Sequence, residues 1–179
     1  MTQVGSVYAQ ALYSLAKVEG LSQKILEELK ALDAAFSQET AFLRLLSTPS
    51  LSKEERAGII DESFAGKVEQ YVLNFMKILM EKGYMLHFPD CCKAYQNCYN
   101  EDNGIVPVSV VTAVPLTQEQ SQRLREKLAK MTGKRVELEC TVDPECLGGV
   151  RLDYDGKRVD DTLAHRLDAL RNLLKNTIL

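Results

Sequence analysis

The chain has 179 residues, of which 45% are hydrophobic and 26% charged, and its formal net charge is −3. This composition is ordinary for a globular protein and excludes collagen-like, low-complexity and extensively disordered chains. Neither half of the sequence has the strong basic excess that binding to a phosphate backbone requires, so nucleic acid is not an expected partner. No apolar stretch reaches the roughly 20 residues of a membrane-spanning helix, and no secretory or transit pattern opens the chain, which predicts a location on the cytoplasmic side of the membrane.

Up to about residue 100, apolar residues recur every three or four positions, which is the period of helices. The pattern predicts six helices, over about 4–19, 22–36, 40–46, 53–64, 67–82 and 84–100, and Pro89 leaves open whether the last begins at 84 or 89. Ser22 is a candidate cap for the second helix, and Ser52 with Glu55 forms a capping box for the fourth. The fifth helix is apolar over most of its circumference, which predicts a place at the centre of the bundle.

From Asn103-Gly104 onward the hydrophobic period changes to two. The pattern predicts a strand over 105–113, a helix between the capping box of Thr117 and Gly133, a strand over 136–142, a hairpin around Asp155-Gly156, and a last helix over about 161–177. The leucine face of that last helix is shorter than two heptads, so packing against the sheet is favoured over a coiled-coil seam. The predicted fold class is α+β: an N-terminal six-helix bundle over 1–104, then a small C-terminal α+β domain over 105–179.

The five cysteines favour reduced, structural thiols over a disulfide framework or a zinc site: Cys91, Cys92, Cys98, Cys140 and Cys146. On one helix, Cys91 and Cys98 would lie about 10 Å apart, too far to share a zinc ion. His87 and Cys91 lie one helical turn apart but supply only two ligands. A thiol- or metal-responsive regulator, based on the three cysteines between 91 and 98, stays open as an alternative function.

Motifs typical of catalysis are missing from the sequence: there is no P-loop, GxGxxG, HExxH or GxSxG. His87 and His165 fall in different predicted domains, so no catalytic residue is assigned. Leu147-Gly148-Gly149 offers a weak nucleotide-binding interpretation, but a strand follows it instead of the helix whose N-terminus would bind a phosphate. A turn with positive φ is the favoured interpretation.

The first predicted helix has two apolar faces. Tyr8, Leu12 and Leu15 form one stripe, and a second face consists of small and aromatic residues: Ala9, Tyr13 and Ala16. Small side chains allow another helix to approach closely. The residues leave two interpretations open, which are tight packing within the bundle and a groove for a partner's amphipathic helix.

Three ordered motifs resemble the δ subunit of bacterial F-type ATP synthases, the counterpart of the mitochondrial oligomycin sensitivity-conferring protein. They are Tyr8-Ala9-x-Ala11-Leu12-Tyr13-x-x-Ala16 near the N-terminus, Val110-x-Thr112-Ala113-x-Pro115-Leu116 after the domain junction, and Val142-Asp143-Pro144-x-x-Leu147-Gly148-Gly149 followed by Asp160-x-Thr162. Their order and spacing cover nearly the whole chain. The sequence departs from the family pattern around 83–98, where Pro89-Asp90-Cys91-Cys92 is unusual.

The resemblance implies a non-catalytic stator subunit without cofactor or metal, on the cytoplasmic face of the bacterial cell membrane and attached to that membrane only through the complex. It implies that the helical domain binds N-terminal helices of α subunits between its first and fifth helices, and that the C-terminal domain engages the b subunits. The implied partner-binding residues are Tyr8, Ala9, Ala11, Leu12, Tyr13 and Ala16, with Phe75 and Leu79 added from the apolar pattern of the fifth helix. The implied structural motif comprises Asp143, Pro144, Leu147, Gly148, Gly149, Asp160 and Thr162.

Overall fold

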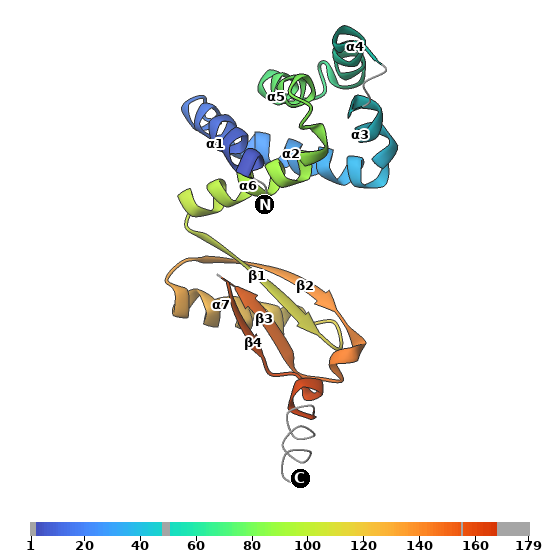
Figure 1. The fold of residues 1–179 in the computed structure, drawn as a ribbon. Helices are drawn as coiled ribbons and strands as arrows, with labels where there is room; N and C mark the ends of the chain where they lie inside the picture. The colour runs from blue at the N-terminus through green and yellow to red at the C-terminus, as the bar shows by residue number, and fades with distance from the viewer. Residues whose placement is uncertain (1–2, 48–50, 155, 168–179) are drawn as a thin grey trace. The chain divides into compact units, whose positions relative to one another are not determined.

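The computed structural model describes residues 3–47, 51–154 and 156–167 of the chain (Figure 1). Its contacts divide it into two compact units, Met1–Tyr99 and Asn100–Leu179. This boundary lies a few residues before the one expected after Gly104, within the last helix of the bundle, which continues to Asp102. No helix among the described residues is long and apolar enough to cross a membrane.

In its described residues, the first unit is a bundle of six α-helices and a one-turn 3₁₀ helix: α1 (Gln3–Val18), α2 (Ser22–Gln38), α3 (Thr40–Ser47), α4 (Lys53–Phe64), α5 (Gln70–Glu81), η1 (Met85–His87) and α6 (Phe88–Asp102). All the helices predicted for this unit are therefore present. The capping box of α4 is confirmed, since Ser52 Oγ accepts from Glu55 N at 3.2 Å and Glu55 Oε2 accepts from Ser52 N at 2.8 Å. Two backbone donors that α4 itself cannot satisfy thus find partners.

The starts of α2 and α5 differ from the prediction, and the structure settles the start of α6, which the sequence left open. Ser22 is the first helical residue of α2 and not its cap, because Leu21 holds that position without a side-chain hydrogen bond. α5 begins at Gln70, later than the expected 67, because the backbone of Glu69 is extended and its N–H donates to Glu28 Oε2 at 2.8 Å. α6 begins after η1, so Pro89 lies in its first turn, where the missing N–H costs no hydrogen bond.

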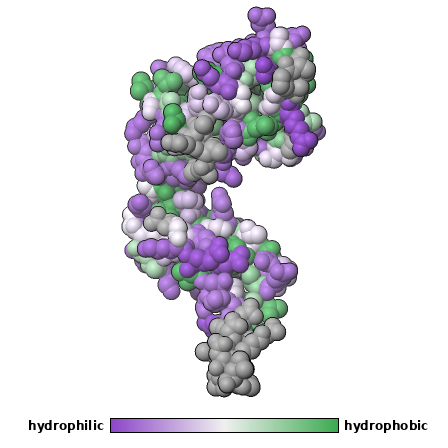
Figure 2. All heavy atoms as spheres, in the orientation of Figure 1, coloured by the Kyte–Doolittle hydropathy of each residue, from purple (hydrophilic) through white to green (hydrophobic). Residues whose placement is uncertain are grey.

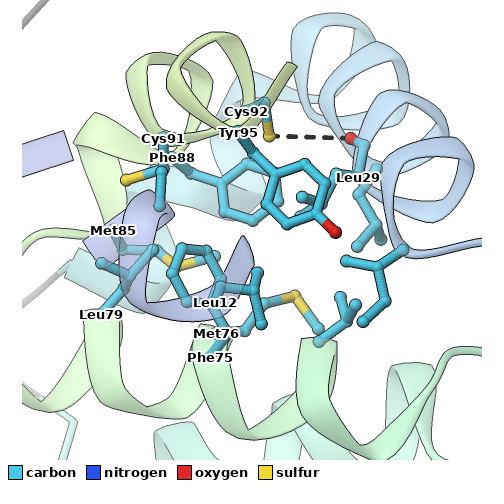
Figure 3. Packing of buried hydrophobic residues seen from close by; sticks show 14 of the residues in the cluster. Leu12, Leu29, Phe75, Met76, Leu79, Met85, Phe88, Cys91, Cys92 and Tyr95 are labelled. Carbon is cyan, nitrogen blue, oxygen red and sulfur yellow. Dashed lines mark hydrogen bonds between the residues drawn. The ribbon is translucent and has the colours of Figure 1, made fainter. Parts of the chain in front are cut away.

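The bundle core gathers around α5, as predicted. Six of its side chains are buried: Val72, Leu73, Phe75, Met76, Leu79 and Met80. Figure 3 shows side chains of α5 pointing toward residues from α1, α2 and α6. In the same core the Phe36 ring centroid lies 5.1 Å from that of Phe88 and 5.6 Å from that of Phe42, which are distances of attractive aromatic pairs.

The second unit is a small α+β fold: β1 (Ile105–Thr112), α7 (Gln118–Thr132), β2 (Arg135–Val142), a 3₁₀ turn η2 (Pro144–Cys146), β3 (Val150–Tyr154) and β4 (Lys157–Asp160). The strand order is β2-β1-β3-β4, with β1 parallel to β2 and both other pairs antiparallel. α7 covers one face of the sheet, where Val108, Val110 and Val136 form a buried cluster with Leu128 (Figure 1). The α+β fold class is therefore confirmed.

The capping box at Thr117 and the left-handed glycine Gly133 bound α7 as predicted. Residues 163–167 are helical, and the remainder of the last predicted helix lies outside the described residues, as does Asp155 of the hairpin. Leu163 and Leu167 are exposed by about half, at 48% and 56%. These two leucines are thus half covered, and the rest of the leucine face lies outside the described residues, so packing against the sheet stays a prediction.

Candidate partner-binding surfaces

The side of α1 that faces the bundle consists of the small and aromatic residues that the sequence singled out. Ala9 and Ala16 have no exposed surface, and Leu12 and Tyr13 are also buried. The Tyr13 ring packs edge-on against Tyr95 of α6, with ring centroids 5.3 Å apart. Of the two interpretations that the sequence left open for this face, tight packing inside the bundle describes the structure.

Six of the eight partner-binding residues expected from the resemblance are thus core residues: Ala9, Leu12, Tyr13, Ala16, Phe75 and Leu79. Of the other two, Tyr8 is half-buried beside Tyr84, with ring centroids 6.0 Å apart, and Ala11 is exposed. A partner helix can touch the six buried side chains only by displacing the core. Of the eight residues, only Tyr8 and Ala11 therefore offer side-chain surface to a partner without a change in the core.

A stripe of exposed apolar side chains runs along α1 beside its buried side. Val7, Ala11, Leu15 and Val18 follow one another at helical spacing, and we call them the α1 stripe. Leu15, expected on the same stripe as Tyr8 and Leu12, is 54% exposed. Figure 2 shows hydrophobic atoms at the surface over α1. A contiguous apolar patch of this kind is typical of a surface that a partner covers.

α5 contacts α1 and adds one large apolar side chain to the surface of the bundle, Ile78, which is 44% exposed. Tyr71 on the same helix is half-buried. This surface could have been found from the sequence, because apolar residues cover a wider part of the circumference of α1 and α5 than packing against one neighbour buries. The apolar residues that the bundle does not bury are the exposed ones.

In the second unit, the residues of the expected structural motif lie where β3 begins and β4 ends. The Asp143 side chain accepts from Glu145 N at 3.0 Å, which fixes the start of η2, and Pro144 is the first residue of that turn. Leu147, Gly148 and Gly149 have φ angles of 59°, 155° and 81°. These are the positive values that the sequence predicts for a turn at this place.

Gly149 packs directly against the backbone that precedes the last helix. A Cβ atom at position 149 would lie 2.2 Å from Asp161 O and 3.0 Å from Thr162 Cα. Two main-chain hydrogen bonds hold this approach, from Asp161 N to Val150 O and from Leu163 N to Gly148 O, both at 3.0 Å. Backbone of the same chain packs against Gly149, and a strand follows the loop where a phosphate-binding helix would begin, so nothing in the described residues supports the nucleotide-binding interpretation.

Asp160 and Thr162 form the start of the last helix. Asp160 Oδ1 accepts from Thr162 N at 3.1 Å and from Thr162 Oγ1 at 2.7 Å, and Thr162 Oγ1 accepts from His165 N at 3.2 Å. The hydrogen bonds from Thr162 lower the pKa of Asp160 below its usual value. These side-chain hydrogen bonds cap the N-terminus of the last helix and fix where it begins after β4.

The cysteines offer neither a metal site nor a reactive pair in the part of the chain that the structure describes. No group of three or more His, Cys, Asp or Glu side chains is placed there to hold a metal ion. Burial, with a smaller contribution from Asp90, raises the pKa of Cys91 to about 11, and burial also raises that of Cys92. Cys92 Sγ donates to Leu29 O at 3.7 Å (Figure 3). Cys91 and Cys92 are thus structural thiols, and nothing in the described residues favours the thiol- or metal-responsive alternative.

Thiol labelling checks this assignment. At pH 8, we expect Ellman's reagent to label the exposed Cys140 rapidly, while Cys91 and Cys92 react only after unfolding, because burial withholds both access and the thiolate form. The Cys140→Ser variant removes the fast phase and serves as the control. Rapid native-state labelling of either buried cysteine, located by mass spectrometry, contradicts the prediction.

The fold and its exposed surfaces thus describe a protein of two small units, one of them a helical bundle with an unpartnered apolar helix face. The chain belongs to the ATP synthase delta (OSCP) subunit family, whose sequence model matches residues 4–174. It is therefore a subunit of the F-type ATP synthase.

Curated relatives match over nearly their whole length. ATP synthase subunit delta of Chlorobium chlorochromatii is 30% identical over 167 residues, which is 93% of both chains. The subunit of the same name from Desulfitobacterium hafniense strain Y51 is 32% identical over 169 residues, 94% of both. A chain of the Toxoplasma gondii mitochondrial ATP synthase hexamer has the same fold, with a TM-score of 0.75 at 17% identity, over 97% of this chain and 98% of that one.

Proposed function

We propose that the chain is a stator adaptor that links the catalytic head of the ATP synthase to its peripheral stalk. In this role it has no catalytic residues of its own, and it holds the head still while the central shaft rotates, so that rotation is coupled to ATP synthesis. It is peripheral, on the cytoplasmic face of the cell membrane, and reaches that membrane only through the complex. Membership of the delta (OSCP) family supports the class of function, and the exposed α1 stripe is the observation that carries the mechanism.

In this proposal the α1 stripe receives the apolar face of an N-terminal helix from an α subunit. The stripe has the spacing with which one helix packs along another, and Ile78 on the adjoining α5 widens the contact. Fully burying a side chain such as leucine stabilises a contact by about 1.5–3 kcal/mol, so several half-exposed residues supply a useful share of the affinity. The six buried residues named from the resemblance support this surface from behind.

The second unit engages the b subunits of the stalk. Support comes from large apolar side chains that remain exposed around the start of β3: Val142, Leu147 and Leu163. Leu163 lies against Gly148, because a Cβ at that glycine would be 2.9 Å from Leu163 Cδ1. A stator contact has to outlast many turnovers, so slow dissociation from both partners matters more than fast association.

Polar substitution on the α1 stripe tests the proposed head contact. We expect Leu15→Gln to weaken binding of a peptide from the N-terminus of the same organism's α subunit by about tenfold, because the glutamine side chain removes apolar contact area. Glutamine is a good helix former, so the unfolding temperature of the bundle should stay unchanged. Isothermal titration calorimetry of the full chain measures the affinity.

The matched control is Ser14→Gln, the same new residue at the neighbouring exposed position of α1, outside the stripe. It should bind the peptide like the unsubstituted chain. Equal weakening by both variants would place the contact elsewhere, and no binding by the unsubstituted chain would remove the proposed head contact altogether.

A further inference from the structure

The strand β2 forms a long open edge of the sheet. Its eight residues, Arg135–Val142, pair along their whole length with β1 on one side, and among the described residues no strand pairs with the other side. Figure 1 shows β2 at one border of the sheet. Prolines and bulges protect open sheet edges in other proteins, and β2 contains neither.

Two main-chain hydrogen bonds show which β2 residues face the open side. Arg135 N donates to Gly104 O at 3.0 Å and Asp143 N donates to Thr112 O at 2.8 Å, so the odd-numbered residues direct their N–H groups toward β1. Because the backbone of a strand alternates, the even-numbered residues direct N–H and C=O outward. The open donors and acceptors are therefore those of Val136, Leu138, Cys140 and Val142.

The two faces of the edge differ in character. A groove of about 560 Å³ runs between α7 and β2, and its lining combines the apolar Ala129, Val136 and Leu138 with the charged Arg125, Glu126, Arg135, Glu137 and Glu139. By the alternation of the strand, the side chains of Glu137 and Glu139 point to the face opposite α7, where they are exposed and make no hydrogen bond or ion pair with any described residue. The carboxylates Glu137 and Glu139 thus stand side by side along a strand whose edge is open.

We propose that this edge receives an extended basic segment of a partner protein, which adds to the sheet as a fifth strand antiparallel to β2. Its apolar residues enter the groove beside α7, and alternate residues are Lys or Arg, opposite Glu137 and Glu139. Arg135 carries the opposite charge on the same face, so it sets the register by excluding a basic residue opposite itself. This surface is separate from the α1 stripe and does not depend on the stator proposal.

A designed peptide is the probe: acetyl-Thr-Val-Lys-Val-Lys-Val-Thr-amide, titrated into the full ¹⁵N-labelled chain. We expect saturable binding by NMR, with new protection from amide hydrogen exchange at Val136, Leu138 and Cys140. The intervening odd-numbered amides already bond to β1, so their exchange should change little. This alternation separates strand addition from any binding to side chains alone.

Changes to the peptide test the main-chain and charge components separately. Methylation of the central valine nitrogen removes one donor and should weaken binding about tenfold or more. A peptide with Glu in place of Lys should not bind, because it meets Glu137 and Glu139 with like charge. Both peptides leave the protein untouched, so the test does not depend on how a variant folds.

Changes to the protein complete the test. Cys140→Pro removes an outward N–H while sparing the β1 ladder and should abolish binding, whereas Cys140→Thr should not. The double variant Glu137→Lys with Glu139→Lys should bind the Glu peptide instead of the Lys peptide. The matched control, Glu62→Lys with Glu81→Lys on exposed residues of the first unit, should keep the preference for the Lys peptide. No saturable binding at millimolar peptide, protection without alternation, or equal binding of both peptides overturns the proposal.

Discussion

Replacing Gly149 with alanine is expected to destabilise the second unit by about 2–4 kcal/mol. The new Cβ would lie 2.2 Å from the backbone oxygen of Asp161, and backbone atoms cannot move aside as the end of a flexible side chain can. The positive φ of 81° adds conformational strain for any residue with a Cβ. Relief requires breaking the hydrogen bonds that join β3 to the segment before the last helix.

Gly133→Ala is the matched control for that loss. Gly133 also has positive φ, at 67°, but a Cβ there would meet nothing within 4 Å. It should therefore cost only the strain of the left-handed conformation, about 1 kcal/mol. Differential scanning calorimetry of the full chain should show the transition of the second unit falling by more than about 10 °C for Gly149→Ala. A loss no larger than that of Gly133→Ala contradicts the close approach.

The second large effect is expected on α1, where the same substitution at two neighbouring alanines should have opposite consequences. Ala9→Trp places an indole in a fully buried position and should destabilise the bundle by about 3 kcal/mol or more, because a packed core has no room for it. Ala11→Trp places the same group on the exposed α1 stripe and should leave the stability of the bundle nearly unchanged.

Urea denaturation followed by far-UV circular dichroism measures both variants. The pair also tests the proposed head contact, since Ala11→Trp should change the affinity for the α-subunit peptide while the chain stays folded. Ala16→Trp should behave like Ala9→Trp, because Ala16 is also completely buried. Similar stabilities for the variants at 9 and 11 would show that the burial of α1 is wrongly assigned.

Local chemistry made most of the fold predictable. The capping boxes at Ser52 and Thr117 and the glycine at 133 act within a few residues of the helix end that they define, so the sequence alone locates those ends. The change of hydrophobic period near Gly104 likewise marks the passage from helices to strands without any knowledge of tertiary contacts.

The predictions that the structure corrects concern features that depend on contacts between residues far apart in the sequence. The start of α5 depends on a hydrogen bond from Glu69 to Glu28 on α2, which no local pattern contains. On α1, apolar residues fill more than half of the circumference, and the sequence does not say which part the bundle covers. The resemblance names α1 as a partner-binding helix, which stays a prediction, and burial divides its residues into the packed Ala9 and Ala16 and the exposed Ala11 and Leu15.

The two hydrogen bonds beside Gly149 have a consequence for how the second unit bears mechanical load. A pull on the last helix reaches β3 through Asp161 N, which donates to Val150 O, and reaches the turn before β3 through Leu163 N, which donates to Gly148 O, besides travelling along the chain to β4. β3 is an interior strand, paired on both sides. Tension on β3 is therefore shared by the hydrogen bonds to β1 and to β4, whereas a force applied to the edge strand alone would break its hydrogen bonds one after another.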